Sequence, residues 1–173
     1  MLAVKGLTVV VLLLVCWEDL RHRAVHWSLF PLTGLLLGAP AYLGRSHAAW
    51  LADLGMNALF LLVQAVALVA WTALRYGRWT DPIGRVIGVG DVLFLAAIVP
   101  GLSFDHFAPY YVSGLVLCLV LHLTVLRHWP GQPRTVPTAG LLAAYLACWV
   151  LMEQLGRMPP LHQGELAMVF WHG

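Results

Sequence analysis

The chain has 173 residues, of which 61% are hydrophobic and only 10% are charged, and its formal net charge is +2. About a quarter of the residues of a soluble domain are charged, so this composition indicates a protein of the lipid bilayer and argues against a water-soluble one. Basic residues are few and spread over several loops, which argues against a nucleic-acid-binding surface. Cys16, Cys118 and Cys148 lie in apolar runs without a C-x-x-C pair, so neither a disulfide framework nor a zinc site is expected.

Apolar runs predict six membrane-spanning helices. Backbone polar groups in lipid must be paired within their own segment, which favours helices of about 20 residues. The first run lacks a small-x-small cleavage site, so we expect it to be retained as a helix. The sequence predicts an all-α, polytopic membrane domain over residues 1–156 and a short extracytoplasmic or interfacial tail over 157–173. The predicted spans are 2–18, 27–44, 49–74, 86–104, 107–126 and 136–155.

The basic residues predict the orientation of these spans. Seven of the ten Lys and Arg residues fall near the first, third and fifth connections, and three fall on the opposite side. The positive-inside rule therefore places the odd connections in the cytoplasm and both termini outside. The seven are Arg21, Arg23, Arg75, Arg78, Arg85, Arg127 and Arg134, and the three are Lys5, Arg45 and Arg157.

Two acidic residues fall at a similar depth in this arrangement. Asp19 lies at the cytoplasmic end of the first span, and Asp91 lies one to two turns into the fourth, which begins on the same side. An ionised Asp at the bilayer centre costs about 2.5–3.5 kcal/mol, so an acid within a span is a functional candidate. Two carboxylates in a partly dry cleft tend to share a proton, and such a pair can activate water and protonate a leaving amine. Gly88 and Gly90 remove side chains beside Asp91 and would let substrate and backbone approach.

Structural roles remain open for the same residues. Asp91 could bond to a neighbouring helix, and Asp19 could be an ordinary interfacial acid beside basic residues. His22 and His26 are four residues apart and could share a helix face near Asp19, but no metal and no cofactor is expected. Three polar residues inside predicted spans are expected to make contacts within the bundle, namely Asn57, Gln64 and His122.

The motifs around the two acids resemble those of a known family. The residues GVGD at 88–91, followed by VLFLAA, resemble the G-x-G-D signature of type IV prepilin peptidases and preflagellin peptidases. These are membrane aspartyl proteases with six core helices. The residues DLRHRAVHW at 19–27 resemble their first motif, and VPTAGLLA at 136–143 resembles the opening of their last helix.

The resemblance implies a function. Asp19 and Asp91 would be the catalytic pair of an aspartic-type endopeptidase in the cell inner membrane, without a cofactor. Its substrates would be membrane-anchored, pilin-like precursors, from which it removes a short basic leader at the cytoplasmic face. Glu18 and Asp81 could offer acidic partners to that leader.

The chain also differs from the family motifs. Leu93 stands where the family has Lys, and His26 and Trp27 stand where it has Pro-Asn. The paired cysteines of the larger, bifunctional members are absent, so methyltransferase activity is not expected. Two other functions therefore stay open, a catalytically inactive membrane scaffold and a small proton-coupled transporter that uses Asp91.

Overall fold

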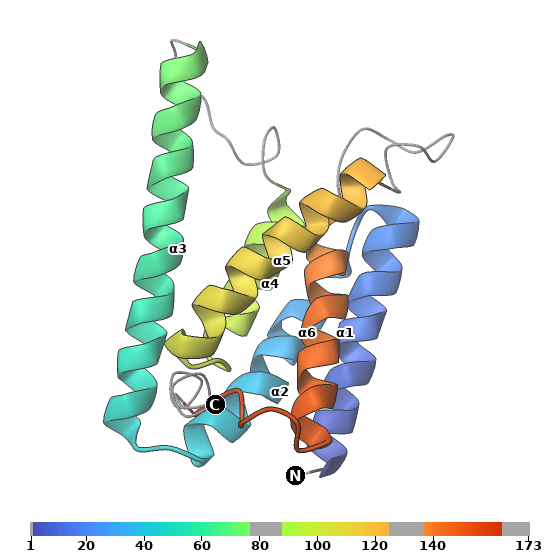
Figure 1. The fold of residues 1–173 in the computed structure, drawn as a ribbon, viewed down its shortest axis with the longest axis vertical. Coiled ribbons are helices and arrows are strands. Elements are labelled where there is room, and N and C mark those ends of the chain that lie inside the picture. The colour runs from blue at the N-terminus through green and yellow to red at the C-terminus, as the bar shows by residue number, and fades with distance from the viewer. Residues whose placement is uncertain (1, 77–87, 125–136, 164–173) are drawn as a thin grey trace.

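The computed structural model describes residues 2–76, 88–124 and 137–163, and these ranges form α-helices with no strand among them (Figure 1). The prediction of an all-helical fold is confirmed for these ranges. The helices are α1 (Leu2–His22), α2 (Leu29–Leu43), α3 (His47–Tyr76), α4 (Val89–Ile98), α5 (Phe104–Thr124) and α6 (Thr138–Gln154).

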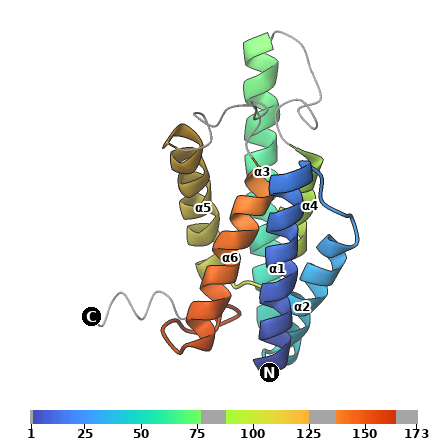
Figure 2. The same cartoon turned by 90° about the vertical axis from the view of Figure 1, so that its right-hand side faces the viewer.

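The α1–α6 pair is the most extensive helix contact in the bundle, and the two helices run side by side in both views (Figures 1 and 2). Small buried residues of α6 explain the close approach, because they let the backbones of two helices come near each other. α2 packs against α1 and α4, and α5 packs against both α6 and α3. The small buried residues of α6 are Ala139, Gly140, Ala143 and Ala147.

Two helices, α3 and α5, are long and apolar enough to cross a membrane. α1 is 21 residues long, but every 18-residue window of it contains at least three charged residues. α2 and α6, with 15 and 17 residues, are shorter apolar helices. The described structure thus contains two helices suited to spanning a membrane, and it does not show the six spans that the sequence predicts.

α4 is much shorter than the span predicted over 86–104. It has 10 residues, which corresponds to about 15 Å at 1.5 Å per residue, half of a hydrocarbon core of about 30 Å. The helix ends at Ile98 because Pro100 lacks an amide hydrogen and Gly101 N–H turns back to the Ile98 carbonyl at 3.1 Å. A Cβ on Gly101 would come within 2.4 Å of Leu37 Cβ. The turn therefore packs directly against α2.

Much of the apolar surface of the bundle is exposed. Only 6% of the most apolar window of α3 is buried. Large exposed hydrophobic side chains follow one another around this helix, including Leu59, Leu62, Val63 and Val66. Soluble proteins rarely expose so large an apolar surface, which agrees with a bilayer as the surrounding medium.

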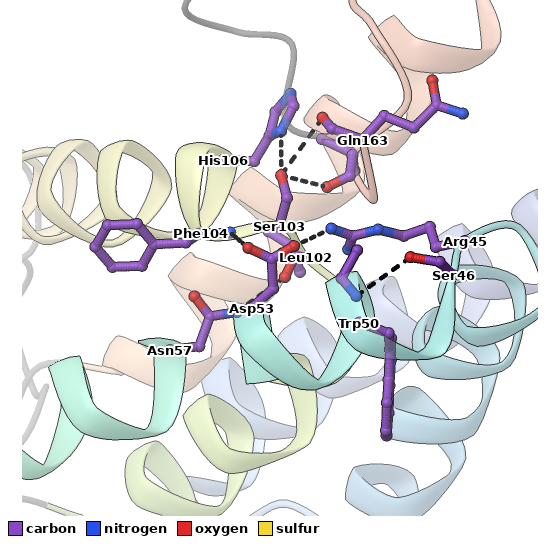
Figure 3. Close-up of polar contacts among 12 residues, drawn as sticks. Arg45, Ser46, Trp50, Asp53, Asn57, Leu102, Ser103, Phe104, His106 and Gln163 are labelled. Atoms are coloured by element: carbon purple, nitrogen blue, oxygen red, sulfur yellow. Dashed lines mark hydrogen bonds and ion pairs between the residues drawn. The ribbon is translucent and has the colours of Figure 1, made fainter. Parts of the chain in front are cut away.

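A polar cluster joins the start of α3 to the α4–α5 connection (Figure 3). Arg45 forms an ion pair with Asp53, and Asp53 Oδ1 accepts a hydrogen bond from Phe104 N–H at 3.1 Å. The buried Asn57 donates from Nδ2 to the carbonyls of Val99 at 3.1 Å and Leu102 at 2.8 Å. The prediction that Asn57 makes a contact within the bundle is confirmed. For Gln64 and His122, no such hydrogen bond is found among the described residues.

Asn57→Asp is expected to lower the free energy of unfolding by about 3 kcal/mol. The new carboxylate keeps the shape of the amide but cannot donate, so two buried carbonyls lose their partner and face a negative charge. The measurement is chemical or thermal unfolding of the full chain in detergent. Acidification should recover part of the loss, because a protonated Asp regains one donor. An unfolding free energy equal to that of the wild type would contradict this role of Asn57.

The segment after α6, residues 155–163, folds back over the end of the bundle that holds the polar cluster. The carbonyl of Leu161 accepts a hydrogen bond from Ser103 N–H at 3.0 Å, and the Leu161 side chain is part of the core. Ser103 Oγ also lies 2.8 Å from His106 Nδ1. The described part of the predicted tail is therefore packed on the bundle, whereas the apolar patch at 166–171 lies outside the described residues.

Lowering the pH is expected to weaken this packing through His162. Burial lowers the pKa of His162 below its ordinary value; Glu153 opposes this shift, and the positive charges of Arg45 and Lys5 add to it. The unfolded chain therefore binds the proton more readily, so stability is lost as the pH falls below about 6.5, the ordinary histidine pKa, and through the lower pKa of the folded state. The measurement is the unfolding temperature between pH 7.5 and 5. His162→Gln should flatten this dependence, and an unchanged profile in that variant would contradict the assignment.

Candidate active site

Asp19 lies in the last turn of α1 with its carboxylate against α6. The residue is 9% exposed, and Oδ2 accepts a hydrogen bond from Gly140 N–H at 2.7 Å. The buried face of α1 includes Leu12, Val15 and Asp19 at spacings of three and four residues, which places them on one side of the helix. Asp19 thus continues the core-facing stripe of α1 to its end.

Asp91 lies in the first turn of α4. Gly88 precedes this helix in an extended conformation, and its carbonyl accepts hydrogen bonds from Asp91 N–H at 3.1 Å and Val92 N–H at 3.3 Å. The side chain is half-buried, and Oδ1 accepts a hydrogen bond from Ala139 N–H at 2.7 Å. Asp91 is therefore also held by the first turn of α6.

The structure brings the two acids together. Each binds one of two consecutive amides, and consecutive Cα atoms are only about 3.8 Å apart. The carboxylates interact electrostatically, and the C-terminal end of α1 and the N-terminal ends of α4 and α6 lie at the same end of the bundle (Figure 1). Residues separated by 72 positions in the sequence thus form one site.

The start of α6 also supplies part of the charge balance. A helix N-terminus carries about half a positive elementary charge, and charge-assisted bonds from its amides stabilise an anion. Half a charge offsets only part of two carboxylates in a partly dry site. Arg23, the first residue after α1, has a left-handed φ of 54° and interacts electrostatically with Asp19. Positive charge therefore reaches Asp19 both from the N-terminus of α6 and from Arg23.

Three glycines near the acids differ in how closely they are packed. A Cβ on Gly140 would lie 2.9 Å from Asp19 Cβ and 3.0 Å from Asp19 Oδ2, so no side chain fits there. A Cβ on Gly88 would lie 3.1 Å from Asp91 Oδ2, whereas one on Gly90 would meet only Phe30 Cζ at 4.0 Å. Of the three glycines, Gly140 therefore has the least space for a side chain.

Glu18, one of the two acidic residues that the sequence analysis offers to a leader, directly precedes Asp19 in α1. Glu18 Oε2 accepts a hydrogen bond from His26 N–H at 2.6 Å, so this carboxylate already has a partner within the chain. Asp81 lies outside the described residues. Leu93, which stands in the place of the family's Lys, is 42% exposed. Within the described ranges no group of three or more His, Cys, Asp or Glu side chains could hold a metal ion.

Sequence reasoning missed the part played by α6. Its Ala139 and Gly140 contribute backbone N–H groups, which are present in every residue except proline and therefore carry no side-chain signature. The available signal was Gly140 itself, a glycine in the first turn of an apolar helix. Such a glycine often marks a close backbone approach.

Comparisons of the chain with models of known protein families, with curated proteins and with solved structures find no match. The site is therefore interpreted from its own geometry. Two neighbouring carboxylates, each anchored through one oxygen to a backbone amide, can accept a proton from water and deliver one to a leaving group.

Proposed function

We propose that this protein is a membrane aspartyl endopeptidase with Asp19 and Asp91 as its catalytic pair. The observation that carries the proposal is the pair of 2.7 Å hydrogen bonds from the Ala139 and Gly140 amides to the two carboxylates. One oxygen of each acid is fixed in this way. Gly88 also makes a backbone interaction with the Asp91 carboxylate, and the proposal assigns the remaining hydrogen-bonding positions of the two acids to water and substrate.

The chemistry follows from one proton shared between two acids. The ionised carboxylate takes a proton from water while the water oxygen attacks the peptide carbonyl carbon, forming a tetrahedral intermediate. The protonated carboxyl then gives its proton to the amide nitrogen as the carbon–nitrogen bond breaks. The products are a carboxylic acid and an amine, so one water is consumed for each bond cleaved.

The proposed setting is the cytoplasmic (inner) membrane, crossed several times, with the site at the cytoplasmic face and both termini outside. The distribution of arginines supports this orientation, and the spanning character of α3 and α5 supports the location. The proposed substrates are membrane-anchored, pilin-like precursors with a basic leader. The resemblance of the three motifs to prepilin peptidases supports that choice.

The test is cleavage of candidate precursors by membranes that contain the wild-type protein. Mass spectrometry of the products should locate a single cut between a basic leader and an apolar segment. Membranes lacking the protein are the control for endogenous proteases. Wild-type membranes that leave every precursor intact would remove the main support for the proposal.

A further inference from the structure

A cavity of about 290 Å³ lies between α3, α4 and α5. Its α4 wall begins directly after Asp91, at the next residue and one turn further on. Its α3 wall belongs to the helix whose apolar window is almost entirely exposed, so the cavity is adjacent to the face suited to lipid. The lining includes Gln64, Ala65 and Leu68 of α3, Val92 and Leu95 of α4, and Tyr111 of α5.

Two polar groups stand in this otherwise apolar lining. Tyr111 packs through its ring against Phe60 and Phe107. Neither the Tyr111 hydroxyl nor the Gln64 amide makes a hydrogen bond to the residues that the structure describes. Polar groups at membrane depth cost free energy unless they are paired. An occupant that matches this lining must therefore be mainly apolar and must also carry groups that can form hydrogen bonds with Gln64 and Tyr111.

The possible occupants differ in whether they offer free hydrogen-bonding groups to this lining. A lipid acyl chain offers no donor or acceptor. The backbone of a regular spanning helix has already paired its own groups. An unwound stretch at the end of an apolar helix exposes both apolar side chains and free backbone N–H and C=O groups, and it satisfies the whole lining.

We infer that this cavity binds the unwound start of an apolar spanning segment of a polypeptide, with Gln64 and Tyr111 pairing its free backbone groups beside Asp91. The inference rests on the proposed function, because a peptide bond must leave the helix before water can attack it. It adds a requirement to the substrate. The apolar segment must unwind readily at the residues that follow the scissile bond.

The experiment measures binding in the Asp19→Asn/Asp91→Asn double variant, reconstituted as the full chain in lipid nanodiscs, so that nothing is cleaved. The probes are two fluorescent peptides with the same basic leader and an apolar Leu/Ala segment of about 20 residues. One peptide carries two glycines at the start of that segment, where they favour unwinding. The glycine peptide should bind about tenfold more tightly than the other.

Substitutions in the lining identify the groups responsible. Gln64→Leu should weaken binding of the glycine peptide about tenfold, which is equivalent to about 1.4 kcal/mol, and should leave the other peptide unchanged. Ala65→Leu should weaken binding of the glycine peptide by filling the cavity. Ala70→Leu makes the same change at an exposed alanine of α3 outside the lining, and it should bind as the parent does.

The outcomes separate this inference from the proposed function. Equal binding of the two peptides, absence of binding, or a Gln64→Leu variant that behaves as the parent would each overturn the inference, even if wild-type protein cleaves precursors. Gln64-dependent binding together with a wild-type protein that cleaves nothing would uphold the cavity as a peptide site and reject the protease.

Discussion

Asp91→Asn is expected to reduce the rate of precursor cleavage at least about 10³-fold, and Asp19→Asn should do the same. Each variant removes a group that must carry a proton in the reaction, and proton transfer by a positioned side chain contributes roughly 10²–10⁴-fold. Both losses should be of similar size because the two acids act as one unit. The measurement is the initial rate of leader removal in membranes or nanodiscs.

These two variants should remain folded. Asn retains a side-chain oxygen that can accept the hydrogen bond now made to Ala139 or Gly140 at 2.7 Å, so the unfolding free energy should change by no more than about 1 kcal/mol. The pattern discriminates between functions. A scaffold would tolerate both changes, and a proton-coupled transporter would depend on Asp91 but not on Asp19.

Gly140→Ala is expected to lower the cleavage rate about 10²-fold and the free energy of unfolding by about 1–3 kcal/mol. The added Cβ would lie 2.9 Å from Asp19 Cβ and 3.2 Å from the Cys16 carbonyl oxygen, so α1 must move away from α6. Forcing a methyl group into a packed interface costs free energy of this size. A displacement of about 1 Å at a catalytic group can cost 10²-fold in rate.

Gly6→Ala is the matched control for this substitution. Gly6 also lies inside a helix, but its Cβ would meet nothing within 4 Å among the described residues. Ala is favoured over Gly in a helix by about 0.5–1 kcal/mol, so this variant should be at least as stable as the wild type and equally active. If Gly140→Ala behaves like Gly6→Ala, the packing of Asp19 against α6 does not limit the reaction.

Apolar periodicity and arginine counting predict the helices and place Asp19 and Asp91 at one end of the bundle. They predict poorly where a helix ends. The long span over 86–104 ignores Pro100 and the packing of Gly101 on Leu37, and the latter depends on a residue more than 60 positions away. Hydropathy measures how a segment prefers lipid, and it contains no information about tertiary contacts that stop a helix.

The contacts of the site that the sequence does not predict also depend on tertiary packing. The partners of Asp19 and Asp91 are backbone amides, and Gln64 matters through the cavity that other helices build around it. Neither kind of contact requires a particular neighbour in the sequence. Side-chain motifs in the sequence therefore identify the two acids, whereas their backbone partners in α6 are identified only from the packing of the helices.

Because both acids bind successive amides of one helix, the rotational phase of α6 controls them jointly. The far end of α6 is fixed to α1 by the ion pair between Lys5 and Glu153 at 2.8 Å. One residue inserted in α6 between Gly140 and Glu153 would turn the two amides by about 100° relative to that ion pair. Both carboxylates would then lose their donors in a single step, so substitutions in α6 at positions other than Gly140 should be less harmful than a change in its length.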